Sequence, residues 1–154
     1  MTTMTHFTFS ELLHSDRAVR DRIPNIANHQ QEGNLLDLVV NVLDPLRDGI
    51  GQPVYVSSGF RCVLLNNKVG GEKQSQHTLG QAADIYGKGD RATRLLGEYI
   101  YDNLVYDQLI FEDVDAAGNP KWIHVSYRQG NNRCQCLVKY RGKSGYNPYK
   151  PHSL

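Results

Sequence analysis

An apolar run from Leu35 to Leu46 is the sequence feature that most limits the folds open to this chain. Its apolar residues recur three and four positions apart, which places them along one side of an α-helix. Pro45 falls in the last turn of that helix, where it removes a backbone hydrogen bond, so we expect a kink or a loosened turn there. We expect Gly49 and Gly51 to end the helix. The run therefore predicts a core helix against which the other elements pack.

The remaining elements follow a clear order along the chain. Helices are expected to begin at Ser10, as an N-cap residue, and to cover residues 63–68 and 90–104. Residues 25–33 and 115–120 read as loops, the second of them closing a hairpin. β-branched and aromatic residues predict strands at 53–58, 81–86, 106–112, 121–127 and 134–140.

Helices first and antiparallel strands later are typical of an α+β fold, with helices packed against a small, mainly antiparallel sheet. The length of 154 residues fits a single domain over 1–154. We expect the tail, residues 146–154, to be loosely held.

Composition excludes several classes of function. The 17 basic and 16 acidic residues give a net charge of +1, which offers no electrostatic basis for binding nucleic acid or a membrane surface. No apolar run approaches the roughly 20 residues that span a bilayer, so we expect no membrane insertion. Residues 1–10 lack a basic region followed by an apolar stretch. We therefore expect synthesis in the cytoplasm without a signal peptide. We also expect the protein to be a monomer.

Histidine and carboxylate side chains gather in two segments. Residues 75–84 contain His77 and Asp84, and residues 122–126 contain His124. Neutral imidazole and carboxylate bind zinc well, and a catalytic zinc site uses three protein ligands and one open position. A histidine taken alone is more often a structural core residue than a metal ligand, and the spacing of His77 and Asp84 is too long for one helical face. The residue types alone leave metal binding open.

The combined pattern resembles a known family. The Ser-x-His-x-x-Gly-x-Ala-x-Asp motif at 75–84, followed by Trp-x-His-Val-Ser at 122–126, is similar to the zinc D-Ala-D-Ala metallopeptidases. These are relatives of the vancomycin-resistance dipeptidases and, in fold, of the hedgehog signalling domain. The Ser-Ser-Gly-Phe-Arg segment at 57–61 resembles the Ser-Gly-Tyr-Arg element that precedes the first ligand in that family. The resemblance runs from about residue 7 to residue 127 and points to its carboxypeptidase-like branch.

The resemblance implies a role for each matching residue. His77, Asp84 and His124 become the zinc ligands, and Arg61 becomes the residue that binds the substrate carboxylate or the polarised carbonyl. A guanidinium suits that role because its planar fork holds carboxylate oxygens bidentately. The alternative for Arg61 is a salt bridge at a strand end. Ser75 and Gln76 either shape the pocket or serve local turn chemistry.

One position departs from the family pattern. Many members carry an acidic general base three residues before the last histidine ligand, and here that position is Lys121. We expect Glu112 to supply the base instead, from a strand position opposite His124 and on the same face of the sheet. The alternative is that Glu112 only pairs with Lys121 at the sheet rim. Asp113 should point to the other face.

These residues predict a zinc-dependent peptidase that hydrolyses peptidoglycan stem peptides at or near a D-Ala end. Its access to the cell wall would depend on a separate release step, as for phage proteins. The alternatives are a non-catalytic, zinc-stabilised binding module and a phage-particle component of the same fold. Whether cleavage is exo- or endopeptidic stays open.

Overall fold

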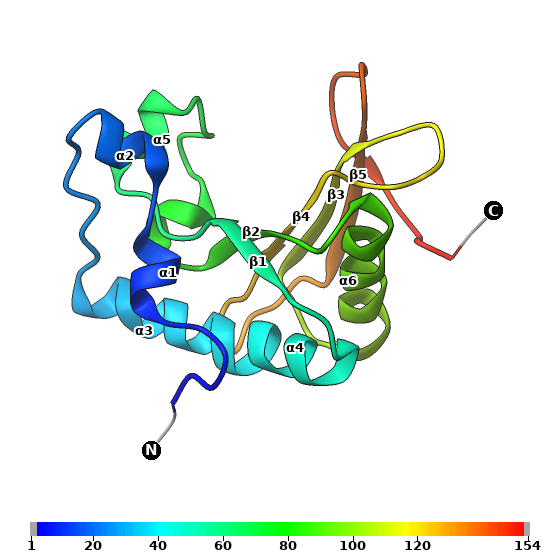
Figure 1. The fold of residues 1–154 in the computed structure, drawn as a ribbon, viewed down its shortest axis with the longest axis horizontal. Helices are drawn as coiled ribbons and strands as arrows, with labels where there is room; N and C mark the ends of the chain where they lie inside the picture. The colour runs from blue at the N-terminus through cyan, green and yellow to red at the C-terminus, as the bar shows by residue number, and fades with distance from the viewer. Residues whose placement is uncertain (1–2, 153–154) are drawn as a thin grey trace.

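A computed structural model describes residues 3–152 and forms one mixed β-sheet with helices around it (Figure 1). Within this range the sheet has the strand order β1-β2-β4-β3-β5-β6. All neighbouring strands run antiparallel except β3 and β5, which are parallel. The strands are Tyr55–Ser58 (β1), Ala82–Tyr86 (β2), Gln108–Val114 (β3), Trp122–Ser126 (β4), Gln135–Tyr140 (β5) and Asn147–Pro148 (β6).

Helical segments precede and interrupt the strands. The α-helices are Phe9–Leu13 (α1), Asp16–Arg20 (α2), His29–Leu38 (α3), Asp44–Ile50 (α4), Val63–Lys68 (α5) and Asp90–Asn103 (α6). A π-helical turn covers Val39–Leu43, and a 3-10 helix covers Gln76–Leu79. The architecture confirms the predicted α+β class with a mainly antiparallel sheet. No helix in the described range combines the length and apolar character needed to cross a bilayer.

The core helix is longer than the apolar run predicted. It runs without interruption from His29 to Ile50, because the π-helical turn joins α3 to α4. That wider turn ends just before Pro45 and accommodates its ring and missing N–H, so the expected local disturbance takes the form of a π-turn. The predicted loop at 25–33 was wrong over its last five residues. Asn28 starts the helix through a capping box with Gln31.

The first helix also begins differently from the prediction. Its N-cap is Thr8, whose hydroxyl accepts a hydrogen bond from the Glu11 amide, whereas Ser10 lies inside the helix. A second short helix follows, capped by Ser15. Several residues near the start of the chain qualify as N-caps, so the choice among them depends on where the chain packs.

Alternation along the strands gives the sheet one apolar face. Ile85 and Ile123 are fully buried on that face, and Phe111 lies beside them in the same core cluster. Helix α6 packs on β2, β3 and β4 there. Gly97 lies at the contact, where an added Cβ would come within 2.5 Å of the Phe111 ring. Only glycine permits this close approach of helix to sheet.

The segment after β5 is anchored, in contrast to the loose tail that the sequence predicted. Strand β6 pairs with β5, and the Tyr149 amide donates to the Cys136 carbonyl at 3.0 Å. The Tyr149 ring packs edge-on against Phe111 with centroids 5.1 Å apart, and Pro151 is buried. Residues 153 and 154 lie outside the described range. Tyr146, just before β6, reaches the face of the sheet that carries Asp84 and His124.

Candidate metal centre

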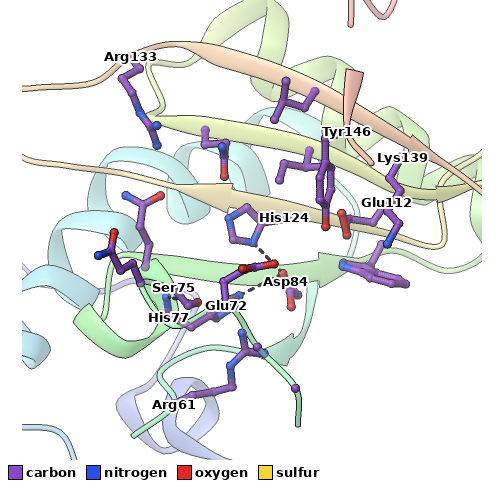
Figure 2. A pocket seen from close by; sticks show the side chains of 18 residues that line it. Arg61, Glu72, Ser75, His77, Asp84, Glu112, His124, Arg133, Lys139 and Tyr146 are labelled. Carbon is purple, nitrogen blue, oxygen red and sulfur yellow. Dashed lines mark hydrogen bonds and ion pairs between the residues drawn. The ribbon is translucent and has the colours of Figure 1, made fainter. Parts of the chain in front are cut away.

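The three predicted metal ligands come together on the face of the sheet opposite α6 (Figure 2). Asp84 on β2 is paired directly with His124 on β4, and the 3-10 helix brings in His77. Asp84 Oδ1 lies 3.1 Å from His124 Nδ1 and 3.3 Å from His77 Nε2. One atom from each residue lies within 4.8 Å of the other two. The predicted set is therefore assembled by the fold.

Local turn chemistry positions His77. The Ser75 hydroxyl accepts a hydrogen bond from the His77 amide at 3.2 Å, which caps the 3-10 helix. Gly80 ends that helix with φ of 75°, and a Cβ at this position would lie 2.4 Å from the Gln31 carbonyl oxygen. The glycine of the motif thus serves the packing of this turn against α3. Ser75 combines both suggested roles, since it also lines the cavity.

A backbone contact orients the His77 ring. Its Nδ1 lies 2.7 Å from the Gly59 carbonyl oxygen in a buried position. A carbonyl oxygen only accepts hydrogen bonds, so Nδ1 carries a proton, and Nε2 is the nitrogen that faces Asp84 and is placed to serve as a metal ligand. Metal-binding histidines are commonly held in this way by an outer hydrogen bond.

The geometry and charge of the three residues fit zinc. Bonds of about 2.0–2.2 Å in a tetrahedral site place neighbouring ligand atoms about 3.3–3.6 Å apart, close to the separations of 3.1 and 3.3 Å in the structure. Burial alone would raise the pKa of the Asp84 carboxyl, but the charge of His77 and hydrogen bonds from both histidines hold that pKa well below its ordinary value. The carboxylate is therefore ionised, as a metal ligand must be. None of the three cysteines, Cys62, Cys134 and Cys136, lines this cavity.

Arg61 lines the same cavity without a carboxylate partner. Among the described residues no carboxylate oxygen lies within 4.0 Å of its guanidinium, which contradicts the alternative of a structural salt bridge. Its Nη1 lies 3.4 Å from the Ser58 hydroxyl, and its Nε is buried with no hydrogen-bond partner. Burial lowers the pKa of Arg61, while Asp84 acts in the opposite direction. An unpaired, partly buried guanidinium is suited to receive an anionic group of a ligand.

Glu112 also faces the cavity, although not in the predicted register. It pairs with Trp122, and Ile110 is the residue opposite His124. A turn centred on Gly118 would place Glu112 opposite His124. The Asp115 carboxylate instead accepts hydrogen bonds from the Ala117 and Asn119 amides and centres the turn one residue earlier, which shifts the register by two residues. A shift of two leaves the side chain on the same face. Glu112 therefore lies diagonally from His124, within the cavity lining.

A β-bulge separates Glu112 from its neighbour. Three steps along β3 from Phe111 to Val114 match two steps along β5, and Asp113 takes a φ of 50°. The bulge keeps Phe111 and Val114 in the core while it turns the Asp113 carboxylate to Arg141, with distances of 3.2 Å. Asp113 lies outside the cavity lining, as predicted.

The surroundings of Glu112 leave part of its carboxylate unsatisfied. Its Oε1 is buried with no hydrogen-bond partner. Burial raises the pKa of Glu112 above the ordinary 4.5, and hydrogen bonding with the Tyr146 hydroxyl acts in the opposite direction. Lys121 is exposed and absent from the cavity lining; it contacts Glu112 through its backbone amide. Pairing of the two side chains at the sheet rim, the alternative considered for Glu112, is not formed.

The cavity of about 650 Å³ includes residues to which no role was assigned from sequence. Trp122 and Leu137 could have been found from strand alternation, since they share the face of His124 and Ile110. Lys139 follows Leu137 on that face, and its Nζ lies 5.5 Å from the centre of the Tyr146 ring. Tyr146 precedes a two-residue strand and carried no periodic signal. It reaches the cavity only because the last segment folds back onto β5.

A sequence profile described as Peptidase M15 matches residues 5–126, most of the chain. The chain belongs to the peptidase M15 family. This family is one of zinc peptidases, so the resemblance to zinc D-Ala-D-Ala metallopeptidases is confirmed. No curated protein matches the chain. The matched range of this M15 peptidase contains the His-Asp-His group, whereas Lys139 and Tyr146 lie beyond it.

Proposed function

We propose that this M15 peptidase uses His77, Asp84 and His124 to hold zinc and Glu112 as its general base, and that it cuts peptidoglycan stem peptides at or near a D-Ala end. The observation that carries the proposal is the cavity that contains both the three potential ligands and a buried carboxylate oxygen without a partner. The finer resemblance to the hedgehog fold belongs to the same proposal.

Zinc, Glu112 and Arg61 each have a definite task in this reaction. When bound, zinc supplies a Lewis acid that polarises the peptide carbonyl and makes water easier to deprotonate. Glu112 accepts a proton from the attacking water, whose oxygen bonds to the carbonyl carbon. As the C–N bond breaks, Glu112 returns that proton to the leaving amine. Arg61 holds an anionic oxygen of the substrate through charge-assisted hydrogen bonds.

The substrate class is tested by direct hydrolysis. The zinc-loaded protein is incubated with a stem peptide that ends in D-Ala-D-Ala, and the products are identified by mass spectrometry. We expect cleavage next to a D-Ala residue that stops when a chelator removes the metal. Zinc binding without cleavage of this peptide would favour the binding module, the alternative suggested by Lys121 at the family's acidic position.

The metal set predicts about one zinc per chain, held by two histidine nitrogens and one aspartate oxygen. Element analysis and X-ray absorption of the purified protein measure both quantities. We expect His124→Ala to lower zinc occupancy strongly, because two remaining ligands hold the ion poorly. His152→Ala is the matched control, since His152 pairs with Asp102 at the surface. Equal zinc content in the two variants would contradict the assigned ligands.

Tyr146 is expected to influence the pH dependence of hydrolysis. Its hydrogen bonding lowers the pKa of Glu112, so Tyr146→Phe should raise that pKa further. The base form would then be lost at a higher pH, and the acidic limb of kcat/KM should move to higher pH. A pH–rate profile measures the shift, with Tyr140→Phe, outside the cavity lining, as control. If the acidic limb of the profile did not move, Tyr146 would have no influence on the pKa of the base.

A further inference from the structure

A second cavity, of about 640 Å³, adjoins the candidate metal centre. It shares with the metal cavity the lining residues Gln74, Ser75, Gln76 and Arg133, which form the border between the two cavities. Lys73 and Arg128 add two more positive charges, and no acidic side chain is among its lining residues. We call Lys73, Arg128 and Arg133 with their cavity the basic subsite.

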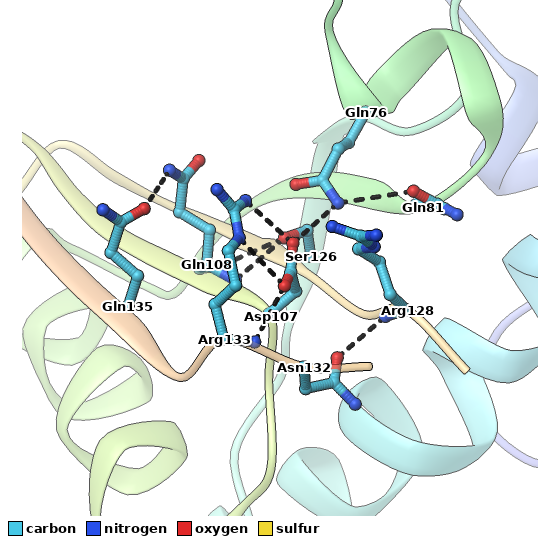
Figure 3. A network of polar contacts seen from close by, with 9 residues as sticks. All are labelled: Gln76, Gln81, Asp107, Gln108, Ser126, Arg128, Asn132, Arg133 and Gln135. Atoms are coloured by element: carbon cyan, nitrogen blue, oxygen red, sulfur yellow. Dashed lines mark hydrogen bonds and ion pairs between the residues drawn. The ribbon is translucent and has the colours of Figure 1, made fainter. Parts of the chain in front are cut away.

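The positive charge of Arg133 is already balanced by the carboxylate of Asp107. Asp107 is fully buried, and its Oδ1 accepts hydrogen bonds from the Arg133 amide at 2.9 Å and Nε at 3.1 Å. Its Oδ2 accepts from Arg133 Nη2 and from Gln76 Nε2, both at 2.9 Å (Figure 3). These four bonds use the capacity of the carboxylate and hold Arg133 and Gln76 in place.

The other two cations remain uncompensated. Arg128 is tied through its backbone amide to Asn132 Oδ1 at 2.8 Å. In the described part of the chain, no carboxylate oxygen lies within 4.0 Å of the Arg128 guanidinium or the Lys73 ammonium. Together with the neutral Arg133–Asp107 pair, they leave the basic subsite with an excess of two positive charges. Side-chain amides of Gln74 and Gln81 also line it and can donate hydrogen bonds.

We propose that the basic subsite binds a carboxylate of the peptide substrate at a distance from the bond that is cut. This inference rests on the proposed function and adds a specificity determinant to it. Because the two cavities share a border, a peptide held in the metal cavity can extend past Gln76 toward Arg128. A carboxylate there meets two uncompensated cations, whereas a neutral amide in the same position gains much less.

The proposal is tested with two peptides that differ in a single group. The first is N-acetyl-L-alanyl-γ-D-glutamyl-L-lysyl-D-alanyl-D-alanine, and the second has its glutamyl carboxylate converted to an amide. Binding is measured by calorimetry on the zinc-loaded full chain carrying Glu112→Gln, which limits cleavage during the titration. We expect the acid peptide to bind about tenfold more tightly. High salt should reduce this difference.

Substitutions that remove one positive charge test which side chain causes the preference for the acid peptide. In the same background Arg128→Gln should abolish most of the preference for the acid, and Lys73→Gln should reduce it about threefold. Arg91→Gln is the matched control, because Arg91 is exposed at the start of α6 and lines neither cavity. Thermal unfolding confirms that each variant is folded. Equal affinity for both peptides, no binding of either, or equal effects of Arg128→Gln and Arg91→Gln would each overturn the proposal.

Hydrolysis by the unsubstituted protein separates this inference from the proposed function. If the amidated peptide is cut but the acid peptide has no binding advantage, the peptidase activity stands and the basic subsite does not. If the acid peptide binds preferentially and neither peptide is cut, the basic subsite stands as a binding site and the proposed reaction fails.

Discussion

Replacing Glu112 with glutamine should lower the rate of peptide hydrolysis by about two to four orders of magnitude, the usual contribution of a general base. The amide has nearly the same shape but cannot accept the proton of the attacking water. Zinc content should be unchanged, since Glu112 is outside the ligand group. Thermal stability should stay equal or rise slightly, because the change removes a buried charge with an unpartnered oxygen.

The control for this experiment is the neighbouring acid. Asp113→Asn changes the same chemical group one residue away, but its carboxylate contacts Arg141 outside the cavity. Its hydrolytic rate should remain within a few-fold of the parent. Comparable losses of hydrolytic rate in both variants would mean that the end of β3 supports the structure of the site and that Glu112 is not specifically the base. A fully active Glu112→Gln protein would remove the base assignment and favour a binding module.

The second large effect is expected at Arg61. Arg61→Lys keeps the positive charge but loses the planar fork that can hold two oxygens of one anionic group. We expect kcat/KM to fall about 100- to 1,000-fold, similar to the loss of one strong electrostatic stabiliser of the transition state. Steady-state kinetics of the zinc-loaded protein measures the effect, and zinc occupancy should stay at the parent level.

A matched substitution tests whether this loss is specific. Arg141→Lys makes the same chemical change in an arginine whose partner, Asp113, lies outside the cavity. That variant should retain near-normal turnover. If Arg61→Lys were equally active, the unpaired guanidinium would have no part in substrate binding, and its buried Nε would need another explanation.

The sequence determined the types of element and the composition of the candidate metal group. Periodicity was sufficient for the core helix, α6 and the main strands, because burial of one helical stripe or one strand face imposes a repeat on the residues. The residues of the candidate metal group were predictable for another reason. His77, Asp84 and His124 fall in a spaced motif whose resemblance to a peptidase family supplied what spacing alone did not, and the structure brings all three together.

Strand alternation also allowed the face of Glu112 to be predicted, although its partner was wrong. Moving a pairing by two residues preserves which side of the sheet a residue faces. The error in turn position therefore affected only the identity of the residue opposite Glu112, which is Trp122 and not His124. The β-bulge at Asp113 was not predicted by strand alternation. It depends on the parallel pairing of β3 with β5, which joins segments more than twenty residues apart.

Only the tertiary structure decided what surrounds the metal group. The last segment folds back because β6 pairs with β5 and the Tyr149 ring packs against Phe111, and this places Tyr146 beside Glu112. The basic subsite likewise combines Lys73 from one loop with Arg128 from another, more than fifty residues further along the chain. Local periodicity reports which face of its own element a residue occupies. It carries no information on which distant segment closes over that face, because the packing energy that decides this exists only once the whole core has formed.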